Sequence, residues 1–157
     1  MKKTAIIAVA LLIIIAGAGA ALAVDIAALD RVSVLMEKAQ VVSLLGNPDE
    51  VTGAEHGLQA EIYRIEGMAP LVGTGCIYQD GRLLVGQSFL FQGELDKVVA
   101  DRLMLLGFTM QEDPAGGFRL LGKDDDTGSP LVAHVTRRNG MTIVTTFEKG
   151  FYDRMVR

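Results

Sequence analysis

The chain has 157 residues, of which 50% are hydrophobic and 22% are charged, and it carries a net charge of −4 and a single cysteine. An acidic chain lacks the clustered Lys and Arg that phosphate binding needs, so nucleic acid is not an expected partner. A lone cysteine excludes an internal disulfide, and the length suits one domain that relies on its hydrophobic core.

Residues 1–23 have the three parts of a bacterial secretory signal. Lys2 and Lys3 give a positive start, residues 4–16 form an apolar stretch, and Ala21-Leu22-Ala23 is a small-x-small cleavage site. We therefore expect a signal peptide here, followed by a mature protein in the periplasm or secreted from the cell.

The alternative is an uncleaved inner-membrane anchor formed by residues 4–24, because about 20 apolar residues span a bilayer. Contact with a membrane is expected only in that case. A lipoprotein signal is excluded, since the only cysteine, Cys76, lies far from the cleavage site. Cleavage leaves residues 24–157, with 13 Lys and Arg against 19 Asp and Glu, a net charge of −6.

Residues 26–45 carry apolar side chains at helical spacing, which predicts either one long helix or two short helices separated near Ser33. Gly46 ends this segment, because glycine suits the left-handed position that follows a helix. Pro48 cannot continue the helix, so the stop is a strong local signal.

Alternation of apolar and polar residues predicts strands at residues 61–65, 74–78 and 83–91, after a polar loop at residues 52–59. Asp80-Gly81 lies between the last two strands. This dipeptide tolerates the positive φ of a tight turn, so it predicts a hairpin.

A second helix is predicted between Gly93 and Gly107. Short strands follow at residues 108–111, 118–121, 131–136 and 141–147. Asn139-Gly140 predicts a hairpin between the last two strands, and the aromatic tail at residues 151–157 is expected to dock on the body.

A helix, a glycine stop, strands and an x-Gly hairpin thus occur twice in the same order, which allows two tandem modules, residues 24–92 and 93–157, within a single domain. The predicted fold class is α+β, with two layers in which helices pack on one face of a mostly antiparallel sheet. The expected core contains Leu35, Val42, Leu45, Tyr63, Ile77, Leu103, Leu106, Val132 and Ile143.

The stretch from Met36 to Asp49, MEKAQVVSLLGNPD, resembles the signature of the SmpA/OmlA-type outer-membrane assembly lipoproteins. That signature is a Gly-Met-Ser/Thr-Lys-x-x-Val helix start that runs into Leu-Gly-x-Pro. Glu61-Ile62-Tyr63 and Asp80-Gly81-Arg82-Leu83 occupy the places of the family's Tyr-containing strand and hairpin turn. The resemblance covers about residues 31–91.

Two departures from the signature lie at the helix start, where Leu35 replaces the Gly and Glu37 replaces the capping Ser or Thr. The lipidated cysteine is also missing. The resemblance implies helices packed on one face of an antiparallel sheet, and the secreted β-lactamase inhibitor proteins have two such modules in tandem. It implies a module that binds other proteins rather than one that performs chemistry.

Four features of the sequence could take part in chemistry. Cys76 lies in a strand-like run and is expected to be buried, with a reactive thiol or an intermolecular disulfide as the alternatives. His56, in a polar loop, and His134, in a strand, share no motif, so neither predicts a zinc site. Asp124-Asp125-Asp126 are consecutive rather than alternating, which favours a solvated loop over a calcium site.

No catalytic, cofactor-binding or metal-binding residue is therefore predicted, and no cofactor. We expect a non-enzymatic interaction or scaffold domain of the cell envelope, whose partner is another envelope protein. The alternative is a periplasmic small-ligand binder or an envelope enzyme. A deep pocket in which His56 or the carboxylates at 124–126 converge would favour that alternative.

Overall fold

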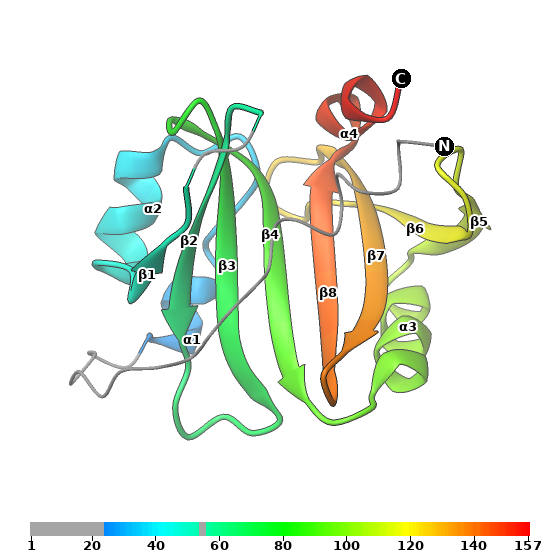
Figure 1. Ribbon diagram of the computed structural model, residues 1–157, viewed down its shortest axis with the longest axis horizontal. Coiled ribbons are helices and arrows are strands. Elements are labelled where there is room, and N and C mark those ends of the chain that lie inside the picture. The colour runs from blue at the N-terminus through cyan, green and yellow to red at the C-terminus, as the bar shows by residue number, and fades with distance from the viewer. Residues whose placement is uncertain (1–23, 54–55) are drawn as a thin grey trace.

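The computed structural model in Figure 1 describes residues 24–53 and 56–157. The predicted signal peptide, residues 1–23, lies outside the described residues. None of the helices that the structure describes is long and apolar enough to span a membrane.

Eight antiparallel strands form one sheet in the order β1-β2-β3-β4-β8-β7-β6-β5. The strands are β1 (Glu50–Val51), β2 (Leu58–Arg64), β3 (Leu71–Gln79), β4 (Leu83–Gln92), β5 (Thr109–Glu112), β6 (Phe118–Lys123), β7 (Pro130–Arg138) and β8 (Met141–Glu148). The four helices of the described residues are α1 (Ile26–Leu29), α2 (Lys38–Leu45), α3 (Asp96–Leu105) and α4 (Lys149–Met155). The predicted α+β class is confirmed.

Two short helices, rather than one long helix, occupy the N-terminal segment, with Ser33 between them. At the start of α2, the Glu37 amide donates a hydrogen bond to Gln40 Oε1 (2.9 Å), one half of a capping box. At its end, Gly46 has φ 79° and donates its N–H to the Val42 carbonyl. The predicted glycine stop is therefore confirmed.

Both predicted hairpin turns are present, and in each the two central residues have positive φ. Asp80 and Gly81 have φ 51° and 64° between β3 and β4, and Asn139 and Gly140 have φ 52° and 73° between β7 and β8. These angles match the right-handed twist of the flanking strands, which explains the choice of Asp-Gly and Asn-Gly.

The sheet consists of two runs of four consecutive strands, β1–β4 and β5–β8, which meet where β4 pairs with β8. Figure 1 shows α2 beside the first run and α3 beside the second, so each run follows a helix. The last hairpin of each run places its final strand at the centre of the sheet.

The hydrophobic core has two clusters that lie on opposite faces of the sheet, because adjacent strand residues point in opposite directions. On the face of Cys76, here called the Cys76 face, α1 and α2 cover Tyr63 and Tyr78. On the face of Ile77, the Ile77 face, α4 covers Val132 and neighbouring residues through the buried side chains of Phe151 and Tyr152. The predicted docking of the aromatic tail is confirmed.

Four of the expected core residues are buried, namely Leu45, Tyr63, Ile77 and Val132. Val42, Leu103 and Ile143 are only half-buried. Two expectations were wrong, since Leu35 and Leu106 are exposed. Leu35 lies in a left-handed turn before α2, and Leu106 lies just beyond the last residue of α3, so neither holds the helical position that the spacing assumed.

Candidate interaction surface

Helix α3 lies on the sheet without burying any of its own residues. Its start is fixed by a hydrogen bond from the Leu95 amide to Thr142 Oγ1 (2.7 Å), and Thr142 belongs to the Cys76 face of the sheet. The helix contacts β6, β7 and β8. It is therefore held in place while Val98, Met104 and Leu105 face solvent.

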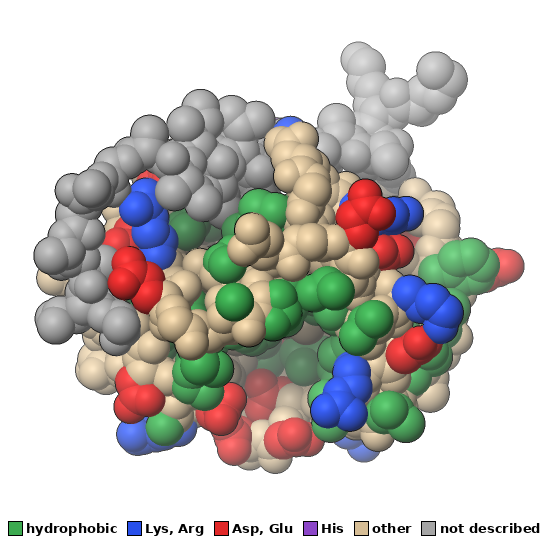
Figure 2. All heavy atoms as spheres, turned by 90° about the horizontal axis from the view of Figure 1, so that it is seen from below, with side chains coloured by type: hydrophobic (Ala, Val, Ile, Leu, Met, Phe, Trp, Pro, Cys, Tyr) green, Lys and Arg blue, Asp and Glu red, His purple; other side chains and the backbone are tan. Residues whose placement is uncertain are grey.

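Five large apolar side chains at the end of α3 and on the adjoining hairpin are exposed. Leu105 and Leu106 each expose 77% of their area and Phe118 exposes 68%. Met104 and Met110 are exposed as well, and together these five residues are here called the α3–β5 surface. At the right of Figure 2, on the side of α3 and β5, hydrophobic side chains reach the surface among charged ones.

Strand pairing places the sheet residues of this surface on one side. Met110 pairs with Leu120 and Glu112 pairs with Phe118, so Met110 and Phe118 point to the same face. Phe108 packs over Gly122 on that face, where a Cβ on Gly122 would lie 2.4 Å from the Phe108 ring. The Cys76 face therefore carries Phe108 and the exposed apolar residues of the hairpin, Met110 and Phe118.

Strand β5 forms the edge of the sheet beside this surface. Its only strand neighbour among the described residues is β6, and all four of its residues are exposed. It contains none of the Lys or Pro residues with which many proteins protect a sheet edge. Glu112 makes no ion pair or hydrogen bond with another side chain in the described part of the chain.

Cys76 is fully buried, as expected. Burial, and to a smaller extent the nearby Glu61 carboxylate, raise the pKa of the Cys76 thiol to about 12. The thiolate is the nucleophilic form, so this cysteine is inert at neutral pH.

His134 belongs to a polar group beneath α4. Its Nε2 lies 3.3 Å from Asp113 Oδ2, and Tyr152 donates a hydrogen bond to the same oxygen at 2.6 Å. Arg119 lies near Asp153, with 3.6 Å between Nη1 and Oδ1. Burial lowers the pKa of His134, Asp113 opposes that shift and Arg119 adds to it. These contacts attach α4 to the sheet.

The acidic run forms a loop that contacts the segment between α1 and α2. Asp124 Oδ1 accepts hydrogen bonds from the amides of Asp126 and Thr127 (3.1 and 2.9 Å), which closes the loop on itself. Ser33 Oγ donates to Asp126 Oδ2 at 3.0 Å. Two of the three carboxylates thus have structural partners.

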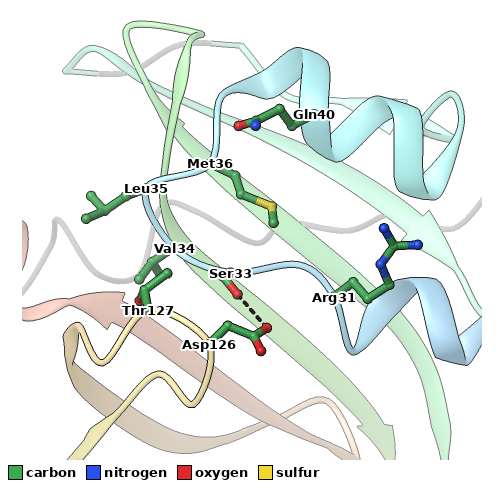
Figure 3. A pocket seen from close by; sticks show the side chains of 8 residues that line it. All are labelled: Arg31, Ser33, Val34, Leu35, Met36, Gln40, Asp126 and Thr127. Atoms are coloured by element: carbon green, nitrogen blue, oxygen red, sulfur yellow. Dashed lines mark hydrogen bonds between the residues drawn. The ribbon is translucent and has the colours of Figure 1, made fainter.

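An open pocket of about 410 Å³ lies between this loop and the α1–α2 segment. Its lining residues are Arg31, Ser33, Val34, Leu35, Met36, Gln40, Asp126 and Thr127. Figure 3 shows Ser33 and Asp126 pointing toward one another across it, with Leu35 turned away from Met36. His56, an exposed loop residue, is not among the lining residues, whereas Asp126 of the acidic run is.

Leu35, at the edge of this pocket, has φ 72° and exposes 47% of its area. Left-handed backbone costs a leucine about 1 kcal/mol or more. The conformation is held by hydrogen bonds between the Leu35 amide and the Leu84 carbonyl, and between the Leu84 amide and the Met36 carbonyl.

The α3–β5 surface was not predicted from the sequence. One signal could have indicated it: Leu105 and Leu106 are adjacent, and successive helix residues are about 100° apart, so both cannot face one narrow core. Comparisons with protein-family models, with curated proteins and with solved structures found no match to this chain.

Proposed function

We propose that the chain is an exported, non-enzymatic interaction domain of the cell envelope that binds another envelope protein through its α3–β5 surface. The observation that carries this proposal is the exposure of five large apolar side chains at the end of α3 and on the adjoining β5–β6 hairpin. Fully burying one Leu or Phe side chain stabilises a complex by about 1.5–3 kcal/mol, so a partner that covers this surface has a large driving force.

The groups that could perform chemistry have other roles here, which supports an interaction function. Cys76 is buried as a neutral thiol, the His134 ring contacts Tyr152 of α4, Asp124 closes the acidic loop, and Asp126 bonds Ser33. Within the described residues, no group of three or more His, Cys, Asp or Glu is arranged to hold a metal ion.

We further propose that the fold is two tandem modules, residues 24–92 and 93–157, with α1, α2 and α3 as one layer on the Cys76 face. The repeated order of helix, four strands and final x-Gly hairpin supports this division. The positive φ of Leu35 supports the resemblance to the SmpA/OmlA-type proteins, because their signature has Gly at this position and Gly adopts that conformation without strain.

Export rests on the secretory pattern of residues 1–23. N-terminal sequencing of the protein from an envelope fraction tests it, and a start at Val24 in the soluble fraction is expected. Retention of Met1 in carbonate-washed membranes would show an anchor at residues 4–24 instead.

Site-specific photo-crosslinking in cells tests the binding proposal. A benzophenone side chain is placed at Leu106 or at Phe118, and the control position is Val51, an exposed apolar residue at the opposite sheet edge. We expect the same adduct from the first two positions and none from Val51. Leu105→Ser with Leu106→Ser in the same chain should reduce the Phe118 adduct about tenfold. Equal adducts from all three positions would contradict the proposal.

A small-ligand binder is the second candidate, favoured by the pocket in which Arg31, Asp126 and Met36 meet. Its volume lies in the usual range for ligand sites, although five of its eight lining residues are exposed. Native mass spectrometry of the exported domain distinguishes the two. A bound small molecule that Arg31→Gln removes would favour this candidate.

A further inference from the structure

We infer that the partner of the α3–β5 surface contributes an extended, basic segment, which pairs with β5 as an additional strand and lays apolar side chains on that surface. This inference rests on the proposed function and names the kind of partner. It combines three features of one edge of the sheet as the described residues form it, namely a strand edge that no other strand pairs with, a flanking apolar surface and a carboxylate without a partner side chain.

The free edge supplies main-chain pairing. An edge strand presents unpaired N–H and C=O groups to any extended chain beside it. The two edges of the sheet differ in length, because β1 has two residues and β5 has four. Strand β5 is therefore the better template for a partner strand.

The register of β5 determines which side chains of an added strand meet the apolar surface. Met110 and Glu112 point to the Cys76 face, on the side of α3, whereas Thr109 and Gln111 point to the other face. Directly opposed residues of an antiparallel pair share a face. An antiparallel segment therefore needs an apolar residue opposite Met110 and, two positions earlier in its own sequence, a residue that suits Glu112.

Charge selects the residue opposite Glu112. This carboxylate is exposed and has no partner side chain within the described residues, and the predicted mature chain has a net charge of −6. A Lys or Arg at that position would neutralise it, whereas an acidic residue would be repelled. The favoured segment thus has the pattern basic, any, apolar.

A second copy of the chain fits this edge poorly. Antiparallel pairing of two β5 strands that keeps the faces continuous opposes Glu112 to Met110, to Phe108 or to another Glu112. In none of these registers does a cation meet the carboxylate. The occupant is therefore a different, basic chain rather than a symmetric partner.

Synthetic peptides test the inference on the purified exported domain. The probe is the acetylated and amidated heptapeptide Thr-Lys-Thr-Leu-Thr-Leu-Thr, and the matched control replaces its Lys by Glu. We expect the Lys peptide to bind roughly tenfold more tightly, from the sum of a favourable and an unfavourable cross-strand charge pair. The variant Glu112→Lys should reverse that preference.

Methylation of the peptide backbone distinguishes strand pairing from non-specific hydrophobic binding without any change in the protein. N-methyl groups on one alternate set of peptide residues block the edge that faces β5, and groups on the other set point away from it. Loss of binding with one set only, together with chemical-shift changes at residues 108–112, is the expected result. Equal binding of both methylated peptides, equal binding of the Lys and Glu peptides, or a concentration-dependent dimer in place of peptide binding would overturn the inference.

The two proposals can fail separately. If none of the peptides shifts the β5 resonances while the Leu106 and Phe118 positions still form their adduct in cells, the basic strand is wrong and the interaction surface stands. If the adduct is also absent, the proposed function fails with it.

Discussion

Helices α2 and α3 hold corresponding places in the two halves of the sheet, yet they pack very differently. Helix α2 buries Val41 and Leu45 against the Cys76 face, whereas α3 buries none of its residues. The segment before α2 is hydrogen-bonded to the start of β4 at several points, and Lys38 pairs with the buried Glu61. The attachments of α3 lie at its start, where the Leu95 amide bonds Thr142 and where Arg137 forms exposed ion pairs with Glu94 and Asp96.

This difference indicates that the first half stabilises the domain and that the second half provides the binding surface. In the first half, more hydrogen bonds and buried side chains hold the helix on the sheet. Loss of the contacts around α2 should therefore unfold the domain. The second half keeps its helix ordered but leaves apolar side chains available, as a binding surface requires. The following predictions test that contrast, beginning with the largest expected effect.

Lys38→Met should lower the free energy of unfolding by about 2–3 kcal/mol. Among the described residues it leaves Glu61, whose side chain is 3% exposed, with only the hydrogen bond from Tyr63, and an unpaired buried charge is costly. Lys38 is about one third exposed, which keeps the loss at the lower end for a buried pair. Adding Glu61→Gln should recover at least half of the loss in urea denaturation, and no recovery would exclude the charge as its cause.

Val41→Ala should cost about 2 kcal/mol, because it opens a cavity at a fully buried position of α2. The matched change in α3 is Val99→Ala, at a half-buried position, and it should cost less than about 1 kcal/mol. Urea midpoints of both variants measure the contrast between the helices directly. Equal losses of stability in the two variants would contradict the contrast between α2 and α3.

Gly46→Val should destabilise the domain by about 1–3 kcal/mol, since φ 79° strains any residue with a Cβ. No atom lies within 4 Å of the added Cβ, so the cost is conformational rather than steric. Gly53 is equally open but lacks positive φ, which makes Gly53→Val the control. If both substitutions cost the same, strain at Gly46 is not the reason.

His134 should make the domain less stable in mild acid. Burial first, and then Arg119, lower its pKa in the folded state, with Asp113 acting in the opposite direction. The unfolded chain, with an ordinary histidine pKa of about 6.5, then binds the proton more readily. The contribution of His134 to stability is therefore constant above that pH and falls as the pH drops below it toward the folded pKa. Urea midpoints between about pH 7 and pH 5 should fall less in His134→Gln than in wild type, and equal falls would contradict this role of His134.

Local patterns predicted much of the fold. Gly46, Asp80-Gly81 and Asn139-Gly140 were identified because their backbone conformations depend on the residue type itself. The assignment of faces was less predictable, because it depends on contacts between distant segments. Periodicity placed Leu35 and Leu106 in the core, but hydrogen bonds to β4 and the end of α3 leave both exposed.

The polar contacts beneath α4 also escaped prediction, since Asp113, His134 and Tyr152 are far apart in the sequence. Strand β1, with two residues, is too short for an alternation signal. The α3–β5 surface was missed for a related reason. Helical spacing alone assigns an apolar residue to the core, and only the packing of the helix shows whether another segment covers that residue.

Native-state hydrogen exchange tests the contrast between α2 and α3, and the binding surface with it, in one measurement. In the free exported domain, amides of residues 98–106 should exchange at least about tenfold faster than those of residues 40–46. In the complex with the crosslinked partner, protection should rise at α3 and β5 and stay unchanged at α2. Equal exchange of the two helices in the free domain, or protection that rises at α2 and not at α3, would contradict the account.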